Sequence, residues 1–449
     1  MIGQTRLQNA LSAIVKRAKV EHVSLCAQAS TRQVFRFAHG SIHQDVFQEQ
    51  LSVKATVIDG KRLGVASTDS LSSANLIACL EAARAIASHA PKMERPFAWA
   101  ERAAIRFSDD YDAATAKLSP KTAIELLAQQ MRRCQGAAAE LAGSFVTGED
   151  ELAVVNSLGL SNYAAASIAA MKCVTFHRGL SGFSSAAART LEALDPDAVL
   201  ARSLEQCLHA TAAVRLPLGI YEVILGPEAI AEILEWLGLI AFGAKAFQEH
   251  TSFLTGRMDE RVMDPQISIY DDAMESGMLR RPFDFEGSPT RRVLLIDRGT
   301  ANSIVYDATY GARYGQASTG HALPPGDTEG PLPLHLAIAP GNTSVEDMIR
   351  SCARGLFIPR LHYVNGLLNP REALMTGLTR EGAFLIERGR FSAPIATLRF
   401  THSITDAFSH VLGVSRKRRL VADPHTGLGC ALAPYIHLEK LTFTGGSES

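Results

Sequence analysis

The chain has 449 residues, more than one ordinary hydrophobic core accommodates, so we expect two or three domains. Apolar residues make up 47% and charged residues 20%, which is typical of a soluble globular protein. Lys and Arg number 45 against 46 Asp and Glu, and this balance argues against nucleic acid or an anionic membrane as the main partner.

The cysteines and the apolar stretches predict the compartment. Seven cysteines are scattered along the chain without a Cys-x-x-Cys pair, as expected for reduced thiols and not for a disulfide framework. The longest apolar region, residues 229–244, is interrupted by Glu232 and Glu235 and is too short to span a bilayer. We therefore predict a cytoplasmic protein that is not membrane-bound.

Residues 1–95 are predicted to form an N-terminal α/β domain. Leu7, Leu11 and Ile14 recur at helical spacing and indicate an amphipathic first helix. Further on, residues 52–68 alternate as two strands joined by an Asp-Gly turn. A helix-start signal at residues 69–72 then predicts a helix that runs to about Ser88.

Residues 96–215 are predicted to form a middle α/β domain after a linker over residues 91–108. Ser119 and Pro120 indicate the start of a helix that runs to about Gly136. The other elements that we expect are strands at 143–147, 152–157 and 169–176, a Gly/Ser-rich loop at 178–186 and a helix at 195–213.

Residues 216–449 change to short apolar runs separated by glycine and proline, which favours a β-rich, mostly antiparallel C-terminal domain. The basic run at residues 416–419 is short and is predicted to be a solvated turn. The predicted fold class is thus α+β, with hairpins and helices in an N-terminal α/β region and a β-rich domain after it.

Several short motifs follow one another over roughly residues 221–445. The segment 283–287 reads Phe-Asp-Phe-Glu-Gly, 318–322 reads Ser-Thr-Gly-His-Ala, and 336–349 combines a strand, a glycine turn and a capped helix. An Asn-Ser-x-Gly turn occurs earlier, at 156–159. In order and spacing these motifs resemble the TldD/PmbA peptidase family, although turns of glycine, serine and threonine are also expected in a purely structural scaffold.

One motif of that family is altered. The segment 223–239 is similar to the strand, turn and helix that carry His-Glu-x-x-x-His, the zinc-binding motif of the catalytic branch, but Leu234 and Leu239 replace the two histidines while Glu235 remains. A leucine side chain has no lone pair for a metal. The chain therefore resembles the TldE/PmbA branch, which lacks the motif.

This resemblance implies a non-catalytic subunit of a heteromeric zinc metallopeptidase that degrades or matures unfolded peptides. No cofactor is then expected in this chain, and zinc is expected in the TldD-like partner subunit. Glu235 would be the general base of a metallopeptidase, but without a metal we expect a relic or a salt-bridge partner. The substrate-groove candidates are Ser318, Thr319, Gly320 and His321, the last expected in an exposed turn.

Two other functions remain open. One is a homodimeric peptide- or protein-binding modulator without hydrolysis, in line with an older family label that refers to DNA gyrase. The other is a divergent stand-alone peptidase that uses Asp423, His425 and Cys430, or Ser318 and His321. Cys430 lies closer to Pro434 than the corresponding cysteine of the TldD branch, and no histidine pair joins it.

Overall fold

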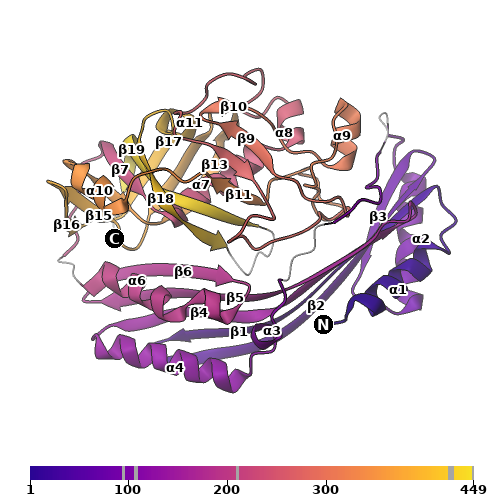
Figure 1. Ribbon diagram of the computed structural model, residues 1–449, viewed down its shortest axis with the longest axis horizontal. Coiled ribbons are helices and arrows are strands. Elements are labelled where there is room, and N and C mark those ends of the chain that lie inside the picture. Colours follow the sequence, from indigo (N-terminus) through magenta and orange to yellow (C-terminus); the bar gives the residue numbers. More distant parts are fainter. Residues whose placement is uncertain (94–96, 106–109, 209–211, 423–428, 447–449) are drawn as a thin grey trace.

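The computed structural model describes residues 1–449 except 94–96, 106–109, 209–211, 423–428 and 447–449. Residues up to 208 form an N-terminal lobe, and residues from 212 onward form a C-terminal lobe. In Figure 1 the long, curved sheet of the N-terminal lobe lies below the C-terminal lobe, and its helices lie on the outer side. The fold is α+β, as predicted.

The N-terminal lobe is one fully antiparallel six-stranded sheet in the order β3-β2-β1-β4-β5-β6. Its strands are β1 His22–Ala38, β2 Ser41–Asp59, β3 Arg62–Thr68, β4 Glu140–Asn156, β5 Ser161–His177 and β6 Leu180–Ala188. Its helices are α1 Gln4–Val15, α2 Ser73–His89, α3 Ala113–Ala116, α4 Pro120–Gly136, α5 Leu191–Leu194 and α6 Pro196–Leu208.

Strand β1 shows how this sheet serves two faces. Val23, Leu25 and Ala27 pack against helices α1 and α2, whereas Cys26 packs on the other face with Phe283 of the C-terminal lobe. Successive side chains of a strand point to opposite faces, so one strand supplies both cores. The outer face is thus closed by helices, and the inner face is left for the C-terminal lobe.

The predicted helix starts are confirmed by their caps. The Ser72 hydroxyl accepts a hydrogen bond from Asn75 N at the start of α2, and Ser119 does the same from Thr122 N at the start of α4. Such caps satisfy backbone N–H groups that the first helical turn leaves without a partner. The amphipathic first helix and the hairpin around the Asp-Gly turn are also present.

The C-terminal lobe contains a mixed 13-stranded sheet. Its strands are β7 Gly219–Leu225, β8 Ile269–Asp271, β9 Val293–Asp297, β10 Thr300–Ala301, β11 His335–Ile338, β12 Arg354–Ile358, β13 Leu361–Asn369, β14 Leu374–Thr379, β15 Phe384–Glu387, β16 Arg390–Pro394, β17 Leu398–Ser403, β18 Val411–Ala422 and β19 Cys430–Gly446. Its helices are α7 Pro227–Ile240, α8 Ala244–Gln248, α9 Ala308–Tyr314, α10 Val345–Ser351, the 3₁₀ turn η1 Pro370–Glu372 and α11 Ile404–Ala407.

Strand β19 organises this sheet. It pairs antiparallel with β7, β17 and β18, and parallel with β11. Among the described strands the only other parallel pair is β7 with β12, so the prediction of a mostly antiparallel domain is confirmed. Helix α7 packs on β19 and β13 and buries its apolar side in the largest core of the molecule.

Several local predictions were wrong. The two strands predicted at 143–147 and 152–157 form one long strand, β4, which ends at Asn156, and the segment 178–186 lies mostly in strand β6 where a loop was expected. The basic run at 416–419 lies in strand β18, where Arg418 pairs with Glu275 and Arg419 with Glu228, so it is not a solvated turn. Neighbouring strands and carboxylates compensate for small or charged side chains that disfavour a strand by composition alone.

The predicted division at residue 95 falls inside a single sheet, because β1 pairs with both β2 and β4. The division at 215 falls shortly before β7, where the second sheet begins. All seven cysteines are free and buried. Among the described residues, the longest apolar helices are still too short or too polar to cross a membrane.

Candidate functional site

Helix α7 carries the altered motif. The helix is regular from Pro227 to Ile240, with Gly226 before it and Pro227 at the first helical position, where a missing N–H costs nothing. Leu234 is fully buried among core side chains, Leu239 is half-buried against the same core, and Glu235 is exposed. Both leucines thus serve as apolar packing residues of the C-terminal lobe.

These three residues do not fit a zinc ion. Leucine offers no donor atom, and Glu235 lies on the exposed side of the helix while Leu234 lies in the core. Gly238 has a packing role here, because a Cβ added to it would lie 3.0 Å from Leu336 Cδ1 of β11.

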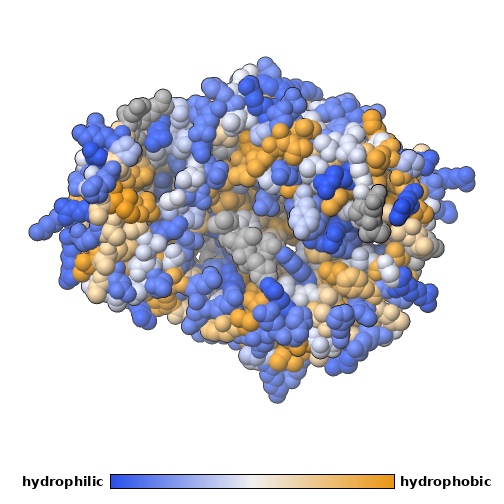
Figure 2. Space-filling view, turned by 180° about the vertical axis from the view of Figure 1, so that it is seen from behind, coloured by the Kyte–Doolittle hydropathy of each residue, from blue (hydrophilic) through white to orange (hydrophobic). Residues whose placement is uncertain are grey.

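A cleft of about 900 Å³ lies between the inner face of the six-stranded sheet and the C-terminal lobe. Its floor comes from β1, β2, β4 and β5, and its opposite wall comes from residues 279–282, Phe285, His335 and Cys430. Figure 2 views the molecule from behind and shows a hollow near the middle of that face. The cleft is wide enough to hold another molecule between the two lobes.

Charged side chains line the cleft in pairs. Arg280 binds Asp110 with a Nη2–Oδ1 distance of 2.6 Å, and Arg32 binds Asp150 at 2.6 Å. Arg189 donates to two backbone oxygens, Ser167 O at 3.1 Å and Arg280 O at 2.7 Å, and so ties strand β5 to the C-terminal lobe. The cleft wall is therefore polar and firmly positioned.

The lobe junction, defined here as residues 156–162 together with 283–290, explains two of the family-like motifs. Asn156 Oδ1 accepts from Leu158 N at 3.0 Å and from Leu160 N at 3.1 Å, which fixes the Asn-Ser-x-Gly turn. Leu160 then packs against Phe283, and Asn162 Nδ2 donates to Gly287 O at 2.8 Å. The two motifs, far apart in sequence, hold each other.

Asp284 is the polar centre of that junction. Its carboxylate accepts from the backbone N–H groups of Glu286, Ser288 and Ala322, at 3.0, 2.9 and 2.9 Å. Burial raises its pKa to about 6, and the three N–H donors limit that rise. Because both oxygens accept hydrogen bonds from backbone groups, Asp284 organises this loop.

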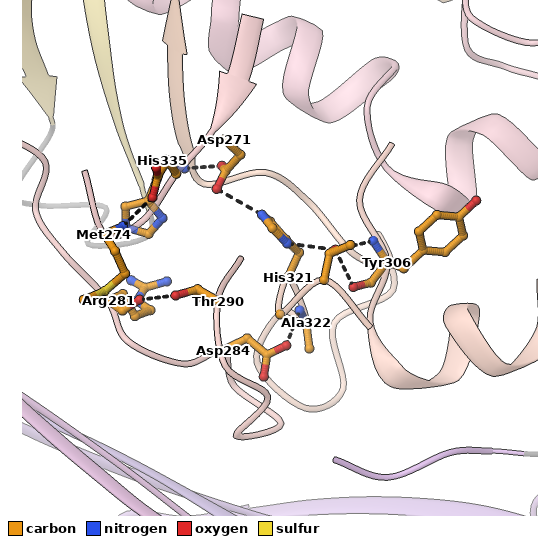
Figure 3. A network of polar contacts seen from close by, with 12 residues as sticks. Asp271, Met274, Arg281, Asp284, Thr290, Tyr306, His321, Ala322 and His335 are labelled. Carbon is orange, nitrogen blue, oxygen red and sulfur yellow. Dashed lines mark hydrogen bonds and ion pairs between the residues drawn. The ribbon is translucent and has the colours of Figure 1, made fainter. Parts of the chain in front are cut away.

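A second polar network lies next to it (Figure 3). His321 Nε2 lies 3.0 Å from Asp271 Oδ1, and Asp271 Oδ2 accepts from His335 N at 2.6 Å. His321 Nδ1 lies 2.9 Å from Thr319 Oγ1, which itself donates to Tyr306 O. Burial raises the pKa of Asp271, but His321 and the His335 N–H outweigh burial, so the pKa lies below its ordinary value.

His335 lies at the end of this network that reaches the cleft. Burial first, and then the positive charge of Arg281, lower the pKa of His335 to about 3, so the imidazole is neutral near pH 7. Arg281 itself lies over the Phe285 ring, 4.8 Å from its centroid. A neutral imidazole beside a guanidinium can accept a hydrogen bond but cannot serve as a general acid.

The four predicted groove residues lie elsewhere. His321 is only 5% exposed, so the expectation of an exposed turn was wrong, because Asp271 and Thr319 hold the ring inside the lobe. Ser318 and Thr319 bond to the backbone of Tyr306, and a Cβ on Gly320 would lie 2.2 Å from Pro289 O. None of the four is among the described residues that line the cleft.

The stand-alone alternative rests partly on Asp423 and His425, which lie outside the described residues. Cys430 is buried beside Met278 and borders the cleft, and burial raises the pKa of its thiol to about 11. A protonated thiol is a poor nucleophile at neutral pH. Ser318 and His321 also do not form a nucleophile–base pair, because Thr319 and Asp271 occupy both ring nitrogens.

Sequence reasoning did not select the cleft residues Arg189, Arg280, Arg281 and His335. The available signal was the Arg-Arg-Pro sequence directly before the Phe-Asp-Phe-Glu-Gly motif. Two adjacent arginines before a tight loop indicate a surface that pairs with acidic side chains or an anionic group. His335, in contrast, gives no signal, because a single histidine at the start of an apolar strand is usually structural.

Comparison with protein families agrees with the geometry. Residues 218–445 match a model described as the PmbA/TldA metallopeptidase C-terminal domain, and residues 23–87 match PmbA/TldA metallopeptidase domain 1. The metalloprotease TldD homolog of Haemophilus influenzae is 24% identical over 228 residues, which cover 49% of this chain and 45% of that protein. A metalloprotease of Methanothermobacter thermautotrophicus is 22% identical over 232 residues, 51% of this chain and 50% of that protein.

Solved structures share the fold over nearly the whole chain. TldE from Thermococcus kodakarensis superposes with a TM-score of 0.87 at 23% identity and covers 98% of this chain and 100% of its own. A putative modulator of a DNA gyrase from Thermotoga maritima gives 0.83 at 20% identity, with 98% and 100% covered. In contrast, the chain spans only about half the length of the two curated metalloproteases that it matches.

Proposed function

Because this chain belongs to the PmbA/TldD metallopeptidase family, we propose that it is the non-catalytic subunit, without the catalytic zinc motif, of a TldD-type zinc metallopeptidase. In this assembly the chain pairs with a subunit that carries His-Glu-x-x-x-His and zinc. Together they enclose unfolded peptides, which the partner hydrolyses. This chain contributes a wall of the chamber and the surface that holds the peptide.

The observation that carries the proposal is the position of Leu234. It stands where the first zinc ligand of the catalytic branch stands, and it is fully buried in an apolar core. A metal ion at that point would have no protein donor and would lose its hydration shell, which is strongly unfavourable. Glu235, the remaining part of the motif, lies on the exposed side.

The cleft supports a role in holding extended peptides. Ala422 of β18 pairs with Cys430, which borders the cleft, so the end of β18 lies at its margin. Among the described residues, positions 419–422 of β18 pair with β19 on one side and with no strand on the other. An edge of this kind accepts an extended peptide through backbone hydrogen bonds, with little preference for side chains.

The test is reconstitution with a paralogue that carries His-Glu-x-x-x-His. We expect the two chains to co-purify, and an unstructured fluorogenic peptide to be cleaved by the mixture but not by this chain alone. A chelator should abolish that cleavage. Two chains that do not associate, with a mixture no more active than the paralogue alone, would contradict the proposal.

Glu235 provides a sharper variant within the same experiment. Glu235→Gln should leave the peptidase activity of the mixture within about twofold, because no metal lies beside it to activate water. The corresponding Glu→Gln change in the paralogue's motif is the matched control and should abolish cleavage. Loss of activity on changing Glu235 would show that this helix takes part in catalysis.

A homodimeric binding role remains the main alternative. The similar structure from Thermotoga maritima is described as a putative modulator of a DNA gyrase, and that description belongs to that protein alone. If cell extracts contain this chain only as a homodimer, and if peptides bind without cleavage in the presence of the paralogue, the binding role replaces the subunit role.

A further inference from the structure

Three side chains with metal-binding donors meet in the C-terminal lobe, outside the cleft and the junction. Glu222 lies in β7, Cys352 directly follows α10, and His437 lies in β19. One donor atom from each, a carboxylate oxygen, a thiol sulfur and an imidazole nitrogen, lies within 4.8 Å of the other two. Segments separated by more than 80 residues converge here, which the sequence alone does not reveal.

This triad lies on the opposite side of the sheet from helix α7. Val223 and Leu225 of β7 pack in the core that contains α7, whereas Ile224 packs in a separate small cluster with Cys352. Ile436 and Leu438 of β19 also point into the core with α7. Because side chains alternate along a strand, Glu222 and His437 point to the face with Ile224 and Cys352.

Within the triad the carboxylate is shared. His437 Nε2 lies 2.7 Å from Glu222 Oε1. Burial, together with a hydrogen bond to Glu222 and the charge of Glu222, raises the pKa of Cys352 to about 12. Glu222 thus faces a thiol on one side and an imidazole on the other.

The triad is enclosed on most sides and reaches solvent at Glu222. Cys352 is fully buried and the His437 side chain is 4% exposed, but the Glu222 side chain is 26% exposed. Residue 355, next to the thiol, is glycine, and a Cβ there would lie 2.6 Å from Cys352 Sγ. The apolar cluster of Ile224, Met348 and Ile386 encloses the other side.

We propose that Glu222, Cys352 and His437 form a zinc-binding site that joins β7, β19 and the segment between α10 and β12. Carboxylate, thiolate and imidazole are the three donor types that zinc takes in proteins, and a fourth position occupied by water would face solvent beside Glu222. The site is structural and is distinct from the catalytic motif, since it lies on the other face of the sheet.

Binding requires only small rearrangements. Zinc–ligand distances of about 2.0–2.3 Å place the donor atoms of a tetrahedral site roughly 3.2–3.6 Å apart. The imidazole and carboxylate move apart slightly, and the thiol moves inward. Cys352 releases its proton to solvent, and His437 binds as the neutral tautomer with its proton on Nδ1, so that the Nε2 lone pair meets the ion. Binding therefore releases the thiol proton and neither oxidises nor reduces any group.

This inference does not rest on the proposed function. A structural ion here is compatible with a non-catalytic subunit, a binding protein or a divergent enzyme. The competing interpretation is a hydrogen-bonded triad without a metal, in which Cys352 and His437 both donate to Glu222. The two interpretations differ in zinc content and in thiolate ligation.

The experiment uses the full-length chain, stripped with a chelator and reloaded with Zn²⁺ or Co²⁺. We expect one zinc per chain by elemental analysis after dialysis, a thiolate-to-cobalt charge-transfer band in the near ultraviolet, and a higher unfolding temperature with metal. Cys352→Ser and His437→Gln should each weaken binding by roughly 100-fold or more, since each removes one of three protein donors.

Two controls separate this site from others. Cys207→Ser, a buried cysteine in α6 of the other lobe, should leave the cobalt band unchanged. Cys430→Ser tests the region of Asp423 and His425; loss of zinc there, with retention in Cys352→Ser, would overturn the inference. So would a wild-type chain that binds no zinc, or one whose cobalt spectrum lacks the thiolate band.

Discussion

Helix α7 and the lobe junction are two regions built from family-like motifs, but different forces stabilise them. Helix α7 is held by apolar burial of Leu234 and its neighbours, whose side chains offer no donor atom to a metal. The junction is held by hydrogen bonds from backbone N–H groups to Asp284 and Asn156, and by the bond that Asn162 Nδ2 donates to Gly287 O. The helix is thus stabilised by apolar packing, whereas the junction is stabilised by polar contacts.

The largest loss of stability should come from shortening a buried side chain of helix α7. Leu234→Ala removes a fully buried side chain and should lower the free energy of unfolding by about 2–5 kcal/mol. Leu239→Ala, at a half-buried position on the same helix, is the matched control and should cost clearly less. Urea denaturation measures both. Equal losses would show that the two leucines are not packed as the structure has them.

The second-largest loss of stability should come from changing Asp284, the polar centre of the junction. Asp284→Asn leaves only one oxygen for three backbone N–H groups, and we expect a loss of about 1–3 kcal/mol. Asp327→Asn is the control, because Asp327 accepts a comparable bond from Glu329 N in an exposed loop. An Asp284 variant as stable as the Asp327 variant would remove the junction's assigned role.

The contribution of the His335 network to stability should depend on pH, whereas the apolar packing of Leu234 should not. His335 has a folded pKa of about 3, below its unfolded value near 6.5, so its stabilising contribution is lost as the pH falls from 6.5 toward 3. Wild type should therefore lose about 1–4 kcal/mol relative to His335→Asn over that range. Parallel profiles for the two proteins would contradict the burial of a neutral imidazole.

Asp284 contributes with the opposite sign. Its folded pKa of about 6 exceeds the unfolded value near 3.9, so the native state holds the proton more tightly and loses this advantage as the pH rises from 3.9 to 6. Repeating the pH series in the Asp284→Asn background separates the contribution of the Asp284 carboxyl to the free energy of unfolding from that of the His335 imidazole. The Leu234→Ala variant should shift the whole profile without changing its shape.

The smallest effect should come from the bond between the lobes. Asn162→Ala removes the donor to Gly287 O and should cost about 0.5–1.5 kcal/mol. Asn302→Ala removes the same kind of bond, Asn302 Nδ2 to Leu294 O, at an exposed site within one lobe. Faster proteolysis between the lobes in the Asn162 variant only would confirm that this bond joins them, and equal proteolysis would not.

How far the sequence predicts this molecule depends on whether the determinants are local. The helices α2 and α4 were predicted from Ser72, Ser119 and Pro120, because caps act within one turn. Strand β1 was missed, since polar residues such as Arg32 and Gln33 interrupt its apolar pattern where its middle lines the cleft. The burial of His321 depends on Asp271, 50 residues away, and no local pattern encodes such a contact.

The candidate site shows the same limit. The proposal that Leu234 and Leu239 stand at the histidine positions of the family motif rests on the sequence, because a motif has fixed spacing. The cleft and the Glu222–Cys352–His437 triad cannot be predicted in this way, because each depends on how distant strands pair. Sheet register, and not composition, brings those residues together.

The central claim is that this chain supplies structure and not chemistry to a peptidase. The most direct measurement is the rate of hydrolysis of one unstructured peptide by this chain alone, by its zinc-motif paralogue and by the two mixed. We expect chelator-sensitive cleavage that rises strongly when the chains are combined, and none from this chain alone. Chelator-sensitive cleavage by the purified chain by itself would contradict the account.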